Sequence, residues 1–455
     1  AVKTRQQVAA AGGEVTVDFY LINEKNVRGN HQLKISVTDS QGKVMEVGTY
    51  ETEAAGGEVY GQLLVKDVKI PVPTAGGLCR IEAKLCKENS VVTTGYDDIL
   101  SVNLASNMLD GKGAVWEDGS ALQNFLKGKT KEAVAAYEDN LGKLDWIMVA
   151  RPPRKDQLTM VPMEALRSAD GKPGLDVVYY EDMEFQKEVY HEVAKVVNLS
   201  AIEGATPSPF VYMLDGYGIK WSGKVLPSVS GEYTIIPQSN DRSMIEVFVN
   251  GKKIYEITRK KEHLGDGKVY LEEGKSADIE IRFRHPRSNA RCRLDWAVPN
   301  DKMPDAQRLM ERAVNDGTKI FIIQSADEWS EFIAANSKAV FKDKFFVGTN
   351  WLGGVMFNKP HDIFKELPVG NALNWPYQAL IHTGVERMGL VMEGEELLVG
   401  AYHTYPMAIG TAMGIVPMGK GSVLFSTLDI YGNIINDSAA GLVAKKLIFN
   451  MIDFK

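Results

Sequence analysis

The chain has 455 residues, of which 44% are hydrophobic and 24% charged, as is ordinary for a globular protein of about three domains. Its net charge of −7 leaves no basic excess, and no apolar run approaches the ~18 residues of a membrane helix. We therefore expect neither nucleic acid as a partner nor a membrane span.

The three cysteines, Cys79, Cys86 and Cys292, form no disulfide framework, because an odd number cannot pair within one chain. Cys79 and Cys86 share one predicted strand, where ~3.3 Å per residue separates them by about 23 Å, far beyond disulfide reach. No CxxC is present, so a thiolate metal site is not expected. The start at Ala1-Val2-Lys3 favours an excised fragment, since a strand pattern begins almost at once.

Residues 1–103 follow the pattern of antiparallel β-structure. Apolar and polar side chains alternate over residues 15–21, and residues 33–37 and 79–85 repeat this period of two. Turn-forming residues separate these runs, and no helical period appears. We expect a small immunoglobulin-like β-sandwich.

The pattern then changes to that of an α/β domain. Residues 113–116 form a short predicted strand, residues 122–141 have helical spacing, and residues 144–149 form a buried strand. The helix expected next is missing, because Arg151-Pro152-Pro153 opens a different region. Helical spacing returns only at Pro304.

The remaining elements of this α/β domain follow Pro304. We expect strands over residues 318–323 and 422–428, a capping box at residues 325–328 that starts a helix, and a last helix over residues 436–454. The prediction is therefore a split flavodoxin/amidotransferase-like α/β domain, residues 104–165 and 300–455, interrupted by a β-module over residues 166–299. The insertion follows a strand, at the edge where open α/β sheets bind ligands.

The inserted module carries a characteristic order of short motifs. They are Trp221-Ser222-Gly223, Gly231-Glu232-Tyr233-Thr234, Ser239-Asn240-Asp241-Arg242, Val249-Asn250-Gly251-Lys252 and Leu294-Asp295-Trp296. This order resembles the lectin-like β-sandwich first named from the bacterial toxin component "protective antigen". The resemblance implies a module that is often inserted into glycosidases and adhesins, several of which bind glycans.

The resemblance also raises the question of calcium. In calcium-dependent members two adjacent aspartates of one loop bind the ion, whereas this chain has Asn240-Asp241 followed by Arg242. One carboxylate beside a cation makes a weak Ca²⁺ site, so we expect no resident cofactor and at most weak calcium at Asp241. Asn240 and Asp241 remain candidate carbohydrate-binding residues, and the alternative is that they only form the turn.

The flanking regions resemble parts of bacterial glycoside hydrolase family 2 proteins. Residues 12–17 and 75–77 resemble the immunoglobulin-like accessory domains of that family. Residues 353–357, 360–368 and 419–423 resemble the amidotransferase-like domain of β-galactosidase-like enzymes. The resemblance implies an upstream glycosidase barrel as a partner, plant or host glycans as ligands, and a periplasmic or secreted location.

We find no catalytic centre in the sequence. The α/β region lacks both a cysteine and a G-x-S-x-G motif, and no stretch could hold a (β/α)₈ barrel of about 250 residues. His361, His382 and His403 have no metal-ligand spacing, so we expect no metal site.

Aromatic residues in loops are the remaining signal. Trp351, Trp375 and Tyr377 lie among Asn, Gly and Pro residues, and Asn374 could bond sugar hydroxyls. These four residues are candidate carbohydrate-binding residues, and the alternative is that the rings pack at domain junctions.

The leading interpretation is a non-catalytic carbohydrate-binding or structural region of a family 2-like, polysaccharide-degrading enzyme. Such a chain would belong to a glycoside hydrolase while lacking its catalytic barrel and nucleophile. The alternative is a free-standing carbohydrate-binding or scaffold protein. A third interpretation is a hydrolase that uses His403 with a serine or aspartate.

Overall fold

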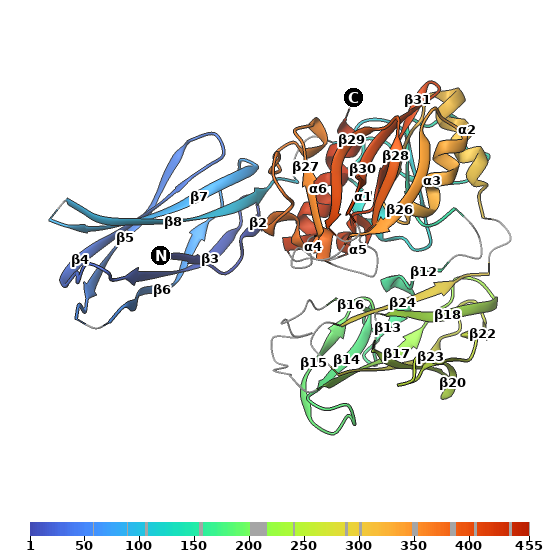
Figure 1. Ribbon diagram of the computed structural model, residues 1–455, viewed down its shortest axis with the longest axis horizontal. Helices are drawn as coiled ribbons and strands as arrows, with labels where there is room; N and C mark the ends of the chain where they lie inside the picture. Colours follow the sequence, from blue (N-terminus) through green and yellow to red (C-terminus); the bar gives the residue numbers. More distant parts are fainter. Residues whose placement is uncertain are drawn as a thin grey trace. The chain divides into compact units, whose positions relative to one another are not determined.

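A computed structural model of the chain divides it into two compact units. Unit 1 comprises Ala1–Leu109, Asn358–Gln378 and Asn436–Lys455, and unit 2 comprises Asp110–Phe357 and Ala379–Ile435. The structure describes residues 1–57, 59–88, 90–104, 108–153, 158–200, 216–239, 242–286, 290–299, 303–347, 354–382, 388–404, 407–435 and 439–454. β-strands dominate both units (Figure 1).

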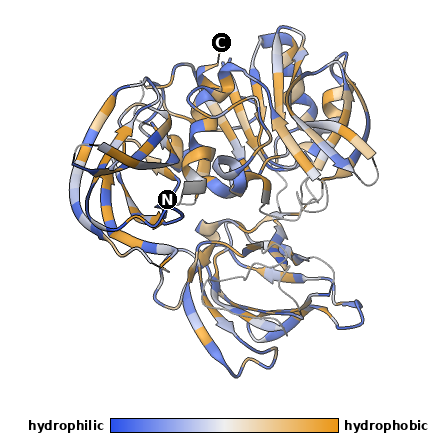
Figure 2. Cartoon of the chain, turned by 60° about the vertical axis from the view of Figure 1, so that its left-hand side comes forward, coloured by the Kyte–Doolittle hydropathy of each residue, from blue (hydrophilic) through white to orange (hydrophobic). Residues whose placement is uncertain are grey.

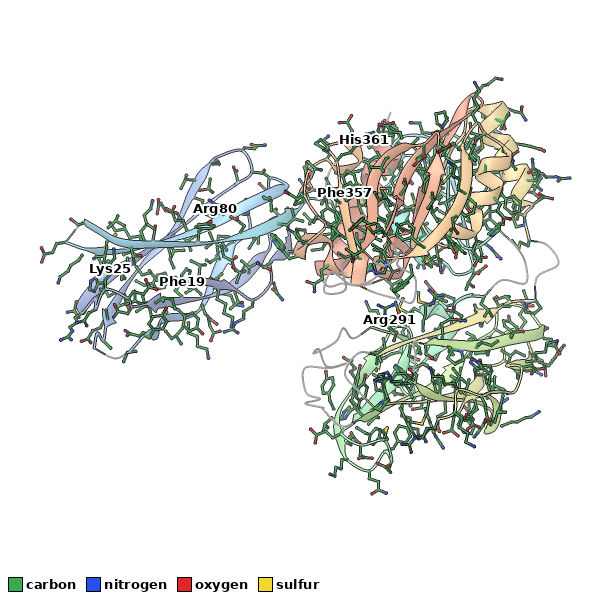
Figure 3. The ribbon with its side chains drawn as sticks, viewed as in Figure 1. Phe19, Lys25, Arg80, Arg291, Phe357 and His361 are labelled. Carbon is green, nitrogen blue, oxygen red and sulfur yellow. The ribbon has the colours of Figure 1, made fainter. Side chains whose placement is uncertain are left out.

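Unit 1 is built on two packed β-sheets. One holds β1 (Val2–Thr4), β3 (Glu14–Ile22) and β6 (Gly61–Pro71); the other is ordered β2 (Val8–Ala10), β8 (Ser90–Val102), β7 (Gly77–Lys87), β4 (Gly29–Thr38) and β5 (Val44–Ala54). The alternation predicted for residues 15–21, 33–37 and 79–85 is confirmed, because every second side chain there is buried. Figure 2 shows hydrophobic and hydrophilic residues alternating along strands of the chain. Phe19 lies in this core (Figure 3).

A long C-terminal helix completes unit 1. The helix α6 (Ala439–Asp453) packs against β2 and against the short helices η3 (Asp362–Phe364) and η4 (Trp375–Tyr377). The Asn450 side-chain amide donates to the Ile363 and Lys365 carbonyls at 2.9 and 3.0 Å. Lys446, only 4% exposed, donates to Glu366 at 2.6 Å and to the Asn103 carbonyl at 3.2 Å. These contacts hold α6 against residues 363–366 and against Asn103, which follows β8.

Unit 2 contains a ten-stranded mixed sheet, whose strands come from the chain before and after the inserted module. Its parallel half is ordered β10 (Ala135–Ala136), β9 (Gly113–Glu117), β11 (Trp146–Ala150), β25 (Lys319–Ile322) and β31 (Gly421–Ser426). An antiparallel half follows, with β30 (Met407–Met418), β28 (Met388–Glu393) and β26 (Val340–Phe346), and β27 (Gly354–Asn358) and β29 (Glu396–Thr404) beside it. Because β11 and β25 are direct neighbours, the chain leaves this sheet and re-enters it next to its exit.

The helices of this sheet are short. Before the insertion the described residues form one α-helix, α1 (Ala121–Leu126); after it come α2 (Ala306–Asp316), α3 (Ala326–Ala335), α4 (Gln378–His382) and α5 (Ile430–Ile434). α2 and α3 pack on one another and on β31, while α1 packs on α5. None of the helices in the described part of the chain combines the length and apolar character that crossing a membrane requires.

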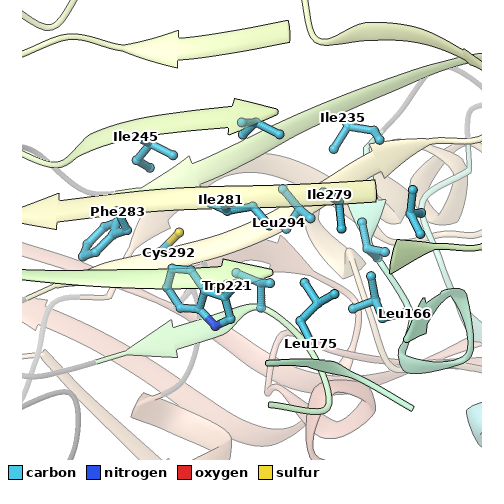
Figure 4. Close-up of a cluster of buried hydrophobic side chains, with 14 of the residues drawn as sticks. Leu166, Leu175, Trp221, Ile235, Ile245, Ile279, Ile281, Phe283, Cys292 and Leu294 are labelled. Carbon is cyan, nitrogen blue, oxygen red and sulfur yellow. The ribbon is translucent and has the colours of Figure 1, made fainter. Parts of the chain in front are cut away.

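The inserted module is a second β-sandwich. One sheet is ordered β12 (Thr159–Met160), β24 (Arg291–Ala297), β18 (Gly231–Ser239) and β22 (Lys268–Leu271), with β16 (Asn198–Ser200) paired to β24. The other is ordered β15 (Glu188–Ala194), β14 (Leu175–Tyr180), β17 (Tyr217–Val225), β23 (Ala277–His285), β19 (Met244–Val249), β20 (Lys252–Ile257) and β21 (His263–Leu264), with β13 (Leu166–Arg167) paired to β17. The inner faces share one apolar cluster, in which Trp221, Phe283 and Cys292 lie together (Figure 4).

Two local predictions are wrong. The helix expected over residues 122–141 ends after Leu126, because Gly128 turns the chain with φ 73° and the Tyr137 amide then bonds to the Val115 carbonyl as a strand. The capping box at residues 325–328 does not form, because Ser325 has left-handed φ 53° and its side chain makes no capping hydrogen bond. A side-chain cap is present instead on the preceding helix, α2, where the Asp305 carboxylate accepts from the Gln307 amide at 2.7 Å.

The expected ranges 104–165, 166–299 and 300–455 stay a prediction as domain boundaries. In the structure, residues 358–378 and 436–455 belong to unit 1 together with the first sandwich, whereas the sequence pattern assigned them to the α/β region. The physical reason is the packing of α6 on η3, η4 and β2, which periodicity alone does not reveal.

The Lys446–Glu366 pair offers a test of this packing. Glu366→Gln should lower the free energy of unfolding by about 2 kcal/mol, less than the roughly 3–5 kcal/mol of a fully buried pair, because Glu366 is 31% exposed. Lys446→Met should lower the free energy of unfolding by less than Glu366→Gln does, because it removes the buried lysine charge itself as well as the attraction between Lys446 and Glu366. Arg80→Gln, in the exposed Arg80–Asp98 pair, is the matched control and should cost under about 1 kcal/mol. Urea unfolding of the full chain measures all three, and equal effects would contradict the account.

Candidate functional site

The carboxyl ends of β9 and β11 form the topological switch point of the parallel sheet. The chain leaves β9 towards β10 on one side and leaves β11 towards β25 on the other. In open α/β sheets, ligands bind in the crevice where neighbouring connections diverge in this way. Three charged residues stand at this position: Glu117 at the end of β9, Asp118 just after it, and Arg151 just after β11.

Glu117 is held by three donors. Its carboxylate accepts from the Leu122 and Gln123 amides at the start of α1, at 3.1 and 3.0 Å, and from the Tyr431 hydroxyl at 2.8 Å. Burial raises the pKa of Glu117 above the ordinary range, although these three hydrogen bonds oppose the shift. The same burial raises the pKa of Tyr431 well above its usual value.

Asp118 and Arg151 form a buried ion pair across the crevice. Their side chains are 13% and 8% exposed, and Asp118 also accepts from the Thr159 hydroxyl. The guanidinium lies 5.6 Å from the Trp116 ring, and the Arg151 carbonyl accepts from the Trp329 indole at 2.7 Å. Burial lowers the pKa of the Arg151 guanidinium, which the Asp118 charge opposes. The pair thus joins both strand ends to β12, the first strand of the inserted sandwich.

A cavity of about 670 Å³ lies against these residues. This volume is within the roughly 300–1,000 Å³ of small-molecule sites. Its floor includes Trp116 and Arg151, its rim includes Asn140 and Arg308, and Ser228 and Val229 of the inserted sandwich complete the wall. We call it the β9–β11 crevice.

A smaller hollow of about 50 Å³ lies at the carboxyl ends of β25 and β31. Ser325 stands there on a sharp turn from strand to helix, with φ 53°. Such a turn is where a hydrolase nucleophile would sit, but among the described lining residues there is no histidine to activate it. Nearby, the Gln324 and Asn198 side-chain oxygens are buried without a hydrogen-bond partner among the described residues.

The predicted sugar-binding residues fall in two groups. Asn240, Asp241 and Trp351 lie outside the described residues. Asn374 is exposed and Trp375 half-buried.

Tyr377 has a different environment, because it is only 2% exposed. Its hydroxyl donates to the Pro368 carbonyl at 2.6 Å and accepts from the Asn358 amide at 3.3 Å. Its ring packs edge-on against Phe364. No face of this ring is free to stack on a sugar, so its role here is to pack η4 on η3.

His361 has a local hydrogen-bond partner, and the three cysteines are buried. His361 accepts from the Ile363 amide at 3.2 Å and so caps η3. The three cysteines are free thiols and all buried. The part of the chain that the structure describes contains no group of His, Cys, Asp and Glu that could hold a metal ion.

Glu117, Asp118 and Arg151 were missed by motif reasoning. One signal was present: all three lie at or just after the end of an apolar strand, and the insertion was expected at that edge of the sheet. The sequence could not show that the first amides of α1 donate to the Glu117 carboxylate or that the Thr159 hydroxyl donates to Asp118.

The family model described as the PA14 domain matches residues 171–308. The two-sheet sandwich occupies this range up to β24, and the match runs on into α2. The chain contains a PA14 domain. The expected lectin-like β-sandwich is therefore confirmed for the insertion, whereas the immunoglobulin-like and amidotransferase-like arrangements remain predictions.

Individual relatives are distant. The anti-sigma-I factor RsgI3 of Acetivibrio thermocellus is 28% identical over 127 residues, which cover 27% of this chain and 19% of that protein. A β-glucosidase from Kluyveromyces marxianus has a TM-score of 0.34 at 13% identity, covering 50% of this chain and 30% of that chain. The PA14 sugar-binding domain of an RTX adhesin has a TM-score of 0.23 at 12% identity, covering 27% of this chain and 88% of that chain.

The raised pKa of Glu117 predicts a pH dependence. A carboxyl group whose pKa is higher in the folded state binds its proton more tightly there, so the free energy of unfolding should fall as pH rises from about 4.3 to the raised value. Glu117→Gln should flatten this fall, whereas the exposed Glu138→Gln should not. Urea midpoints from about pH 4 to about pH 7 measure it, and identical profiles for wild type and Glu117→Gln would contradict the assignment.

Proposed function

We propose that this chain is a non-catalytic, carbohydrate-binding region of a glycan-degrading protein and that its PA14 domain contacts the glycan. The match of residues 171–308 to the PA14 domain is the observation that carries the proposal. The sugar-binding PA14 domain of the RTX adhesin agrees with this choice of ligand class.

The PA14 framework supports a binding loop at its edge. β18 belongs to one sheet and β19 to the other, so the loop that contains Asn240 and Asp241 connects the two sheets. The two strands that flank the loop are fixed in the sandwich core, where Ile235 of β18 and Ile245 of β19 are fully buried. Both sheets therefore anchor the loop, and a rigid anchor reduces the entropy lost when a ligand is bound.

The flat outer face of the larger PA14 sheet is a poorer candidate. Its charged side chains already pair with one another: Lys220 with Glu280 at 2.9 Å, and Arg284 with Glu246 at 2.9 Å. Phe248 on this face is covered by Arg282, whose guanidinium carbon lies 4.7 Å from the ring centroid. A sugar would have to break these contacts, so the loop edge is favoured.

The loop suits sugar hydroxyls better than a calcium ion. Asn240 offers an amide that donates and accepts, and Asp241 offers one carboxylate. Arg242, exposed and with φ 75°, places a positive charge next to them, which disfavours a divalent cation. We propose direct hydrogen bonds to the glycan, with calcium at most weakly bound at Asp241.

Asn374 and Trp375 are proposed as a second glycan contact, in unit 1. Asn374 is exposed and the neighbouring indole is half-buried, so an amide and part of an aromatic surface are available together. Trp351 is kept in the proposal on its sequence context alone.

The larger context follows from the family 2 resemblance. We propose residues 1–103 as an immunoglobulin-like accessory domain and residues 104–165 with 300–455 as an inert amidotransferase-like domain that braces an upstream glycosidase barrel. Plant or host glycans would be the ligands, in the periplasm or outside the cell. The alternative is a free-standing carbohydrate-binding or scaffold protein, which a gene lacking any upstream barrel would favour.

A glycan array probed with the full chain tests the proposal. Wild type should bind a defined set of neutral glycans, and Asp241→Ala should weaken that binding by about tenfold or more, since one good hydrogen-bonded contact corresponds to roughly 1.4 kcal/mol. Glu272→Ala, an exposed acid that pairs with Lys275, is the matched control and should bind normally.

Two outcomes would contradict this account. Binding that disappears on calcium removal would show that Asp241 acts through the ion. Turnover of aryl glycosides that a single substitution in this chain abolishes would show that the region is catalytic.

A further inference from the structure

We propose that the β9–β11 crevice is a further binding site, for a neutral polyhydroxylated ligand, a short oligosaccharide. It lies at the edge of the α/β sheet, and none of the described residues that were predicted to bind sugar lines it. Its place at the switch point and its volume of about 670 Å³ are those of a ligand site. Only the choice of a sugar as the ligand class rests on the proposed function.

Phosphate ligands do not fit the crevice. In α/β folds a phosphate usually sits on the first amides of the helix that follows the first strand. Here the Glu117 carboxylate already accepts from those amides, at Leu122 and Gln123. The acids Asp118, Glu138 and Asp139 add further negative charge to the lining. The Glu117 carboxylate therefore occupies the position where a phosphate would bind.

Cations do not fit well either, because the inner carboxylates already have partners. Asp118 pairs with Arg151 and accepts from Thr159, and Asp139 accepts from the Asp305 amide at 3.0 Å. Carboxylate oxygens that already accept such hydrogen bonds have few lone pairs left to coordinate a cation. The lining therefore favours a ligand that is neutral and strongly hydrogen-bonding.

The rim can supply hydrogen bonds of both kinds. Glu138 accepts, Arg308 donates, and Asn140 does both; all three side chains are exposed and line the crevice. Arg308 is 68% exposed and its nearest acid, Asp139, lies 3.9 Å away, so its guanidinium can turn to a ligand without breaking a short ion pair. Alternating donors and acceptors match the hydroxyl groups of a sugar ring, each of which donates and accepts.

The PA14 domain forms part of the same wall. Ser228, Val229 and Val298 line the crevice, and Thr159 of β12, which pairs with β24, bonds to Asp118. An oligosaccharide in the crevice would therefore contact both the α/β sheet and the PA14 domain.

Titrations of the full chain by ligand-observed NMR and calorimetry test the inference. The probes are cellotetraose, xylotetraose, galactotetraose and maltotetraose, with inorganic phosphate and spermidine as anion and cation. Asn140→Trp places an indole at the rim, and Arg308→Ala removes a donor; both residues are exposed, so neither change should unfold the protein. Gln41→Trp, in an exposed turn of the first sandwich, is the control.

The expected result is that at least one tetrasaccharide binds and that Asn140→Trp and Arg308→Ala each weaken this binding by about tenfold or more, while Gln41→Trp does not. If Asp241→Ala abolishes all binding and the crevice variants change nothing, the crevice is not a site, and the proposed function of the PA14 loop stands. Displacement of the sugar by phosphate or spermidine, or no binding of any tetrasaccharide, would overturn the inference as well.

Discussion

The buried Asp118–Arg151 pair is the interaction on which the arrangement of unit 2 depends. Two charges removed from water are tolerated only when they pair and their remaining hydrogen-bonding groups are satisfied, and removing one partner of such a pair typically costs about 3–5 kcal/mol. Here the pair joins the ends of β9 and β11, while Thr159 and Trp329 complete its surroundings. It stands where the chain departs from the α/β sheet into the PA14 domain, so it sets both the floor of the crevice and the start of the insertion.

The insertion leaves the parallel sheet intact because the two strands that flank it remain neighbours. Trp146 to Val149 pair in register with Lys319 to Ile322, so the sheet closes across the gap as if the module were absent. A long insertion at such a point adds little closure entropy, since that cost grows only with the logarithm of length. The consequence is a PA14 domain whose base is also a wall of the neighbouring crevice.

Periodicity predicted the strands well and the polar contacts poorly. The alternation over residues 15–21 and the apolar runs at 144–149 and 318–323 gave strands in the expected places, because burial of one face or of both faces imposes those patterns. The helix over 122–141 was wrong because its apolar residues fit a helix locally, while Gly128 and the strand pairing of Tyr137 decide otherwise. Tyr377 looked like a loop aromatic, yet its hydroxyl bonds to Pro368 inside the core. Such outcomes depend on partners distant in sequence, which no single-sequence pattern contains.

The most direct test of this account is hydrogen exchange of the full chain with and without Asp118→Asn. If the ion pair couples the α/β sheet to β12, which pairs with β24 of the PA14 domain, exchange should quicken together in Trp146–Ala150 and in Thr159–Met160, while Glu14–Ile22 in unit 1 stays unchanged. Unchanged protection in both segments, or a change confined to one of them, would contradict the claim that this pair joins the two.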